Sequence, residues 1–118
     1  MARKSKEILR ELESGFQAYT KAYPKRGQFM SSLHDTCVVP GPLDKKTVHL
    51  IAVALGICRM CEYCIATHTK EAFEAGATRE ELTEAAFVAI LMSGGPAVTY
   101  SATLFLDSIN AFAPDFGK

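Results

Sequence analysis

Apolar residues recur at spacings of three and four along most of this chain, and this spacing restricts the chain to helical structure. Ile8, Leu12, Phe16 and Tyr19 follow the pattern near the N-terminus, where they would share one face of an α-helix. No segment alternates convincingly between apolar and polar residues as a strand would, and no internal repeat is evident. The sequence therefore predicts an all-α fold.

Capping and helix-breaking residues divide the chain into six predicted helices. Asp44 can cap a helix, and Thr78 and Glu81 form a capping box. Gly76 offers a left-handed helix stop, and Pro96 suits the first turn of the last helix. We expect helices over residues 5–23, 25–36 and 44–56, from the cysteine-rich run to 75, and over 78–92 and 96–112, with a loop at 37–43.

The length and charge of the chain restrict its class and its partners. The 118 residues suit a single domain, 1–118, with a core that needs no disulfide support. Lys+Arg and Asp+Glu number 13 each, a balance that argues against nucleic acid and against an anionic membrane surface as partners. The charged N-terminus lacks a signal-peptide pattern, and no apolar run approaches the roughly 20 residues of a membrane span. We therefore expect a cytoplasmic protein.

The predicted helix at 78–92 contains a stretch, residues 85–92, that is apolar on every side. Such a stretch requires burial all round. Either it is the central helix of the core, or contacts between subunits cover it. The sequence leaves both interpretations open.

Three cysteines and a histidine lie within eleven residues: Cys58, Cys61, Cys64 and His68. A C-x-x-C pair can cycle between dithiol and disulfide with little backbone movement. His68 follows Cys64 by four residues, so a helix would place the imidazole on the same face as the sulfur. If the pair lies in the first helical turn, unpaired backbone N–H groups and the helix dipole favour thiolate. This pattern favours redox chemistry at sulfur.

A metal site is the main alternative from a different class. Cys58, Cys61, Cys64 and His68 match the outline of a run that holds an iron–sulfur cluster, and all four are acceptable zinc ligands. Cluster-binding runs usually wrap a loop around the metal, however, whereas this run has helical periodicity on both sides. Redox chemistry is therefore the preferred interpretation.

Several further residues receive simpler predictions. We expect Cys58 to pack in the core, Cys37 to be an unpaired thiol, and Tyr63 to pack beside the cysteine pair. His34 is expected at the surface, with nothing reactive around it, and His49 either faces the cysteines or is a satisfied core histidine.

The order of several motifs resembles one known family. These motifs are Leu43–Thr47, the apolar helix Leu50–Leu55, Cys61–His68, Glu74–Leu82 and Gly94–Ala97. Together they resemble the carboxymuconolactone decarboxylase family, specifically its AhpD-like alkylhydroperoxidase branch, over about residues 40–110. The decarboxylase branch lacks the cysteine pair, and this chain has it.

The resemblance implies a role for each matching residue. Cys64 would attack a small hydroperoxide, Cys61 would resolve the product to a disulfide, and His68 would belong to a proton relay. The family's relay glutamate, just ahead of Leu50, is His49 in this chain. The pair would be recycled by a dithiol reductant, such as a lipoyl or thioredoxin-like protein, without a metal or organic cofactor. The family is all-helical and forms trimers or hexamers. A catalytically silent or decarboxylase-like member remains an alternative.

Overall fold

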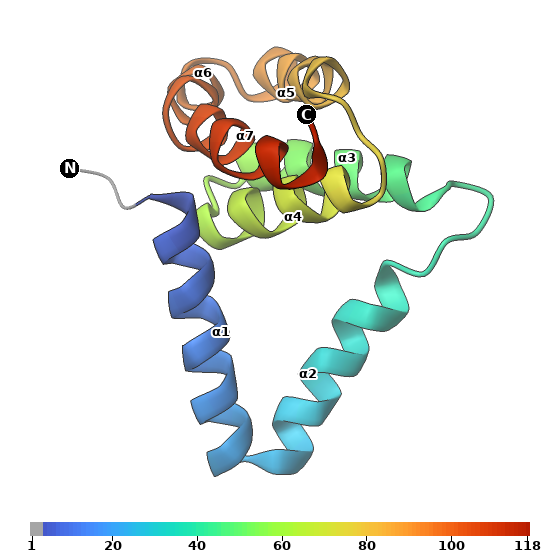
Figure 1. Cartoon of the computed structure of the whole chain (residues 1–118), viewed down its shortest axis with the longest axis vertical. Coiled ribbons are helices and arrows are strands. Elements are labelled where there is room, and N and C mark those ends of the chain that lie inside the picture. The colour runs from blue at the N-terminus through green and yellow to red at the C-terminus, as the bar shows by residue number, and fades with distance from the viewer. Residues whose placement is uncertain (1–3) are drawn as a thin grey trace.

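A computed structural model describes residues 4–118, and helices account for most of this part of the chain (Figure 1). The α-helices are α1 (Ser5–Ala22), α2 (Pro24–Cys37), α3 (Lys45–Cys58), α4 (Glu62–Glu74), α5 (Arg79–Ser93), α6 (Gly95–Tyr100) and α7 (Leu106–Phe112). A π-helical segment, Ser101–Phe105, joins α6 to α7, and a 3-10 turn, Ala113–Phe116, follows α7. The described residues contain no strand, which confirms the all-α prediction.

The helices form a body and a projecting arm (Figure 1). In the body, α3 and α4 lie side by side, with α5 packed on α3 and α7 packed on α4. The arm is a V made by α1 and α2, which meet at Tyr23 and diverge toward the body. The largest fully buried side chain is Phe73 of α4. Within residues 4–118, no helix is both long enough and apolar enough to cross a membrane.

The local signals in the sequence give the helix boundaries. The Asp44 side chain accepts a hydrogen bond from the Thr47 N–H at 2.8 Å and so begins α3. Thr78 and Glu81 form the predicted capping box at the start of α5. Gly76, with φ of 97°, reverses the chain after α4. The caps at Asp44 and Thr78 satisfy N–H groups that the first turns of α3 and α5 leave unpaired.

The predicted last helix, 96–112, is present but irregular. Its middle turn is π-helical rather than α-helical. The Thr103 hydroxyl donates to the Thr99 carbonyl at 2.7 Å, and the Thr99 hydroxyl donates to the Gly95 carbonyl at 3.3 Å. These side-chain bonds compete for carbonyls that the regular helical ladder would use, which favours local loosening of the helix.

The apolar helix α5 is not the central core helix of a single chain. Ala86 and Ala89 are buried, but the larger side chains on its other face are exposed, Leu91 to 81%. The interpretation as a central core helix is therefore wrong. That contacts between subunits cover this exposed face remains a prediction. The exposed apolar side chains of α5 are Phe87, Val88, Leu91 and Met92.

A close contact between α3 and α4 fixes the position of the cysteine pair. A Cβ atom on Gly56 would lie 3.0 Å from the Cβ of Cys64 and 3.4 Å from the Ile65 nitrogen. Between the helices the chain turns through Met60, which has φ of 54°, and the Cys61 N–H donates to the Gly56 carbonyl at 3.0 Å. Glycine at position 56 therefore lets the end of α3 contact the first turn of α4.

We expect Gly56→Ala to lower the free energy of unfolding by about 1–2 kcal/mol, because crowding against Cys64 outweighs the better helix propensity of alanine. Urea unfolding of the full chain measures the change. Gly15→Ala in α1 is the matched control, because its new Cβ would have no heavy atom within 4 Å. That variant should gain about 0.5–1 kcal/mol. Equal stabilisation by both substitutions would contradict the packing argument.

Candidate functional site

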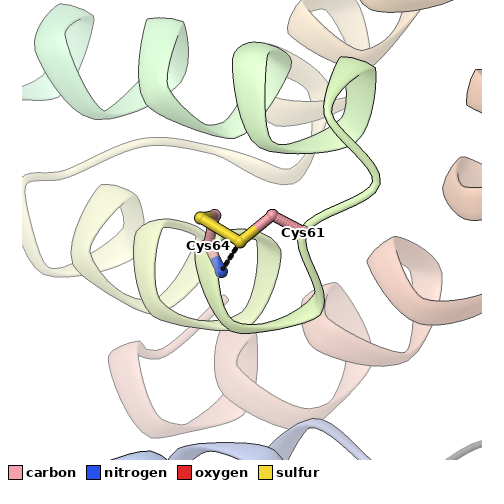
Figure 2. Close-up of a disulfide and its surroundings, with 2 residues drawn as sticks. All are labelled: Cys61 and Cys64. Carbon is pink, nitrogen blue, oxygen red and sulfur yellow. Dashed lines mark hydrogen bonds between the residues drawn. A yellow bond between two sulfur atoms is a disulfide. The ribbon is translucent and has the colours of Figure 1, made fainter.

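Cys61 and Cys64 form a disulfide at the start of α4 (Figure 2). Their Cα atoms are 5.2 Å apart. Cys61 is the N-cap residue of α4, and its sulfur accepts a hydrogen bond from the Cys64 N–H at 3.2 Å. Cys61 and Cys64 thus occupy the N-cap and the first turn of α4, close to the location that a helix-stabilised thiolate requires.

This location suits thiol chemistry. Backbone N–H groups at a helix N-terminus have no partner within the helix and attract negative charge. After reduction of the disulfide, the Cys64 N–H would stabilise a thiolate on Cys61. Cys64 itself is only partly buried and lies one turn before His68 on the same helix. Once reduced, the pair would therefore have a helix N-terminus that favours thiolate and a histidine one turn further along the same helix.

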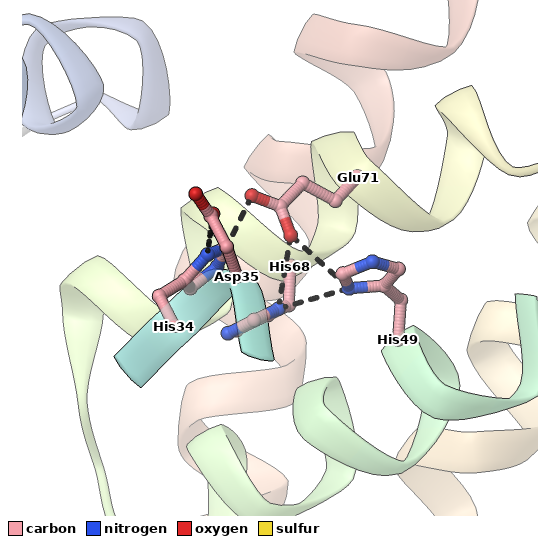
Figure 3. Close-up of polar contacts among 5 residues, drawn as sticks. All are labelled: His34, Asp35, His49, His68 and Glu71. Atoms are coloured by element: carbon pink, nitrogen blue, oxygen red, sulfur yellow. Dashed lines mark hydrogen bonds and ion pairs between the residues drawn. The ribbon is translucent and has the colours of Figure 1, made fainter. Parts of the chain in front are cut away.

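His49 of α3 and His68 of α4 meet beside this helix (Figure 3). Their Nδ1 atoms are 3.1 Å apart, and their rings stack with centroids 5.4 Å apart. His49 is 1% exposed, and its Nε2 has no hydrogen-bond partner. A buried lone pair costs less than a buried unsatisfied N–H, so the ring proton of neutral His49 belongs on Nδ1, toward His68.

Glu71 joins the two histidines, and the sequence predictions missed it. Its Oε2 lies 3.1 Å from Nδ1 of His49 and 3.4 Å from Nδ1 of His68. A local signal was present, because Cys64, His68 and Glu71 are spaced by four and then three residues, which places them on one face of a helix. The resemblance directed attention to a carboxylate on the preceding helix, whereas the carboxylate lies on α4 itself.

The surroundings of His34 differ from the prediction that nothing reactive lies near it. Its Nε2 lies 3.6 Å from Oε1 of Glu71, and its ring stacks on His68 with centroids 5.9 Å apart. Its Nδ1 lies 3.1 Å from Oδ1 of Asp35. The arm brings α2 across to α4, a contact between helices that helical periodicity alone does not reveal. The site thus contains an imidazole from each of three helices around one carboxylate.

Burial and neighbouring charges shift the pKa values in this cluster. Burial lowers the pKa of His49 below its ordinary value, although the Glu71 carboxylate opposes the shift. For Glu71, burial acts to raise the pKa, but interactions with His68, and then with the charges of His49 and His34, outweigh it and lower the pKa. Both shifts favour a neutral His49 beside an ionised Glu71.

The other two cysteines, Cys37 and Cys58, are not part of the disulfide. Cys58 is partly buried near the end of α3, and its Sγ donates to the Ala89 carbonyl at 3.7 Å. Cys37 is exposed and free, as predicted. The alternative metal site would need the sulfurs of Cys58, Cys61 and Cys64 together, whereas two of them are joined to each other here.

Two open clefts lie along the arm. One, of about 480 Å³, lies between α1 and α2 and reaches the histidine cluster at His34. The second, of about 360 Å³, shares Leu12, Phe16 and Met30 with the first and extends to Tyr63, whose hydroxyl contacts Glu11. The clefts thus join an apolar surface of the arm to His34 of the cluster and to Tyr63, the residue before Cys64.

Comparison with known families gives one match that covers most of the chain. The model of the carboxymuconolactone decarboxylase family matches residues 24–107. The match extends the resemblance seen in the sequence to α2, the helix that carries His34.

Individual proteins agree with this match. A crystal structure of an apo carboxymuconolactone decarboxylase family protein from Legionella pneumophila has a TM-score of 0.83 and 34% identity, with 97% of each chain covered. An uncharacterised protein of Cupriavidus necator is 33% identical over 108 residues, which are 90% of this chain and 96% of that one. An uncharacterised protein from the cox locus of Paracoccus denitrificans is 43% identical over 72 residues, 59% of this chain and 65% of that one.

We expect the free energy of unfolding to fall as the pH is lowered through about 6.5, the ordinary pKa of histidine. Because the pKa of His49 is lower in the folded protein, the unfolded chain takes up a proton first, and acid favours unfolding. The lowered pKa of Glu71 adds a second loss below the ordinary value of 4.5. Urea titrations at a series of pH values measure both losses. The His49→Asn variant should lose the decline near pH 6.5, and an equally steep decline in that variant would contradict the assignment.

Proposed function

The chain belongs to the carboxymuconolactone decarboxylase family, and we propose that it is a thiol-dependent peroxidase of the family's alkylhydroperoxidase-like branch. The observation that carries the proposal is the Cys61–Cys64 disulfide at the N-terminus of α4, one helical turn before His68. A decarboxylase-like role would leave this redox-active pair without a use.

The first chemical step oxidises Cys64. Its thiolate attacks the terminal oxygen of a hydroperoxide, the O–O bond breaks, and the sulfur becomes a sulfenic acid. The two electrons of the new S–O bond come from sulfur, and the departing alkoxide takes a proton to leave as an alcohol. His68, four residues further along α4, supplies that proton as a general acid.

The second step closes the disulfide. The Cys61 thiolate, favoured by the Cys64 N–H, attacks the Cys64 sulfenic acid and releases hydroxide, which leaves as water after protonation. A partner dithiol, such as a lipoyl or thioredoxin-like protein, then reduces the disulfide by thiol–disulfide exchange and is itself oxidised. Recycling by a dithiol fits a reducing cytoplasmic setting.

His49 and Glu71 would serve His68 in this proposal. Ionised Glu71 lies 3.4 Å from Nδ1 of His68 and 3.1 Å from Nδ1 of neutral His49, so it would hold the His68 ring in a fixed orientation. Glu71 would therefore provide from α4 the carboxylate that the family pattern places on the preceding helix, where this chain has His49. His49 and Glu71 are positioning residues, because the contacts that they make are with His68 and not with the sulfurs.

The apolar clefts along the arm favour a small organic hydroperoxide as the substrate. Leu12, Phe16 and Met30 line both clefts, and His34 and Tyr63 mark their ends near the cluster and the cysteine pair. An alkyl chain would bury apolar surface there, while the polar peroxide group faces the site.

We also propose that the chain forms a homo-oligomer, either a trimer or a hexamer. Phe87, Val88, Leu91 and Met92 form an exposed apolar face on α5, and Phe29 and Leu33 are exposed separately on the arm. A contact between copies would remove both surfaces from water. Light scattering of the full chain measures its mass, and a monomer would contradict this part of the proposal.

Hydroperoxide consumption with a dithiol reductant tests the activity. We expect Cys64→Ser and Cys61→Ser each to abolish turnover, and only Cys61→Ser to accumulate a sulfenic acid that dimedone traps, because only that variant keeps the attacking sulfur without its partner. Wild-type protein that cycles its disulfide but consumes no hydroperoxide would contradict peroxidase activity and leave thiol–disulfide exchange with a partner.

A second arm of the same assay tests the proton relay. We expect Glu71→Gln to reduce turnover by about tenfold to a hundredfold and to change the pH profile, because acid–base catalysis of this kind contributes about 10²–10⁴ in rate. Glu74→Gln is the matched control, since Glu74 is on the same helix and exposed. Equal activity in both variants would remove Glu71 from the relay.

A further inference from the structure

Four side chains that commonly bind metals converge beside α4, apart from the cysteine pair (Figure 3). His49 Nδ1, His68 Nδ1 and Glu71 Oε2 form a triangle with sides of 3.1, 3.1 and 3.4 Å. His34 approaches from α2, and ligand atoms of His34, His68 and Glu71 all lie within 4.8 Å of one another. The cluster thus combines three imidazoles and a carboxylate.

Protons alone cannot satisfy this triangle. With Glu71 ionised, only the two Nδ1 atoms can carry protons, so at least one of the three short contacts has no proton of its own. If both Nδ1 atoms carry protons, the two N–H groups face each other at 3.1 Å. If only one carries a proton, the lone pair of the other nitrogen faces Oε2 of Glu71, which is also a hydrogen-bond acceptor. Consistent with this, Glu71 Oε2 is buried and has no hydrogen bond of acceptable geometry.

A cation just outside the plane of the triangle would contact all three atoms at once, and the ring proton of His49 would then move from Nδ1 to the buried Nε2. Ligands about 2.0–2.1 Å from a tetrahedral ion lie about 3.3 Å from one another, close to the sides of this triangle. Imidazole nitrogen with one carboxylate oxygen is a donor set of zinc and similar transition metals, whereas calcium and magnesium prefer oxygen alone. His34, whose Nε2 lies 3.6 Å from Oε1 of Glu71, is 42% exposed, so its side chain can turn toward the fourth position.

We propose that His49, His68 and Glu71, with His34 as the fourth ligand, form a binding site for a divalent first-row transition metal such as zinc. This site differs from the cysteine-based alternative, because it needs no sulfur and persists when Cys61 and Cys64 are joined. An ion bound to His68 occupies the lone pair on Nδ1 and changes the basicity of the whole ring. Metal binding would therefore stop the proton relay, a consequence that rests on the proposed function, whereas the site itself does not.

Zinc titration of the oxidised full chain, in competition with a chromophoric chelator, tests the site without any turnover. We expect one equivalent to bind, and Glu71→Gln and His34→Gln each to weaken binding by about tenfold or more. Glu74→Gln should bind as the wild type does. Circular dichroism checks that each variant is folded, and the exposed position of His34 makes its variant the safer of the two.

Cobalt provides a second readout that identifies the ligands. Bound Co²⁺ should show the visible bands of a four-coordinate ion without the near-ultraviolet band of thiolate ligation, and Cys61→Ser/Cys64→Ser should bind it equally well. Failure of the oxidised wild type to compete for zinc, or equal binding by Glu71→Gln and Glu74→Gln, would overturn the proposal. Loss of binding in the double cysteine variant would move the ion to sulfur. Peroxidase activity with no zinc binding would overturn this inference alone.

Discussion

The contact between the end of α3 and the first turn of α4 determines the geometry of the candidate site. Gly56 has no side chain to separate the two helices, so Cys64 packs directly against it. The same two helices carry His49 and His68, whose Nδ1 atoms are 3.1 Å apart. One helix–helix interface therefore sets both the position of the disulfide and the spacing of the imidazoles. Movement along this interface would alter both.

Features that depend on neighbouring residues were predictable from the sequence. Asp44 caps α3 through Thr47, and Thr78 pairs with Glu81 at the start of α5. The C-x-x-C pair follows the same rule, because three residues of separation at a helix start bring the sulfurs together. In each case the interacting groups lie within one helical turn, so the sequence pattern contains the necessary information. The six expected helices were predictable for the same reason, whereas the family was recognised from the order of motifs along the chain.

Features that depend on the path of the arm were not predictable in this way. His34 reaches Glu71 only because α1 and α2 fold as a V whose far end returns to α4. Helical periodicity gives the faces of α2 but not the element against which each face packs. Glu71 is an intermediate case, since its spacing from His68 was visible but its role depends on His49 from another helix. The π-helical turn in the last helix follows from hydroxyl bonds that propensities do not resolve.

The contact between His34 and Glu71 also joins the arm to the body of the molecule. His34 belongs to the arm and Glu71 to the body, so a titratable pair helps to hold the arm against the body. The arm also carries exposed apolar residues, among them Phe29 and Leu33. Glu71 belongs both to the histidine cluster and to a contact that joins the arm to the body. The same helix, α2, thus carries a histidine of the cluster and part of the apolar surface on the outside of the molecule.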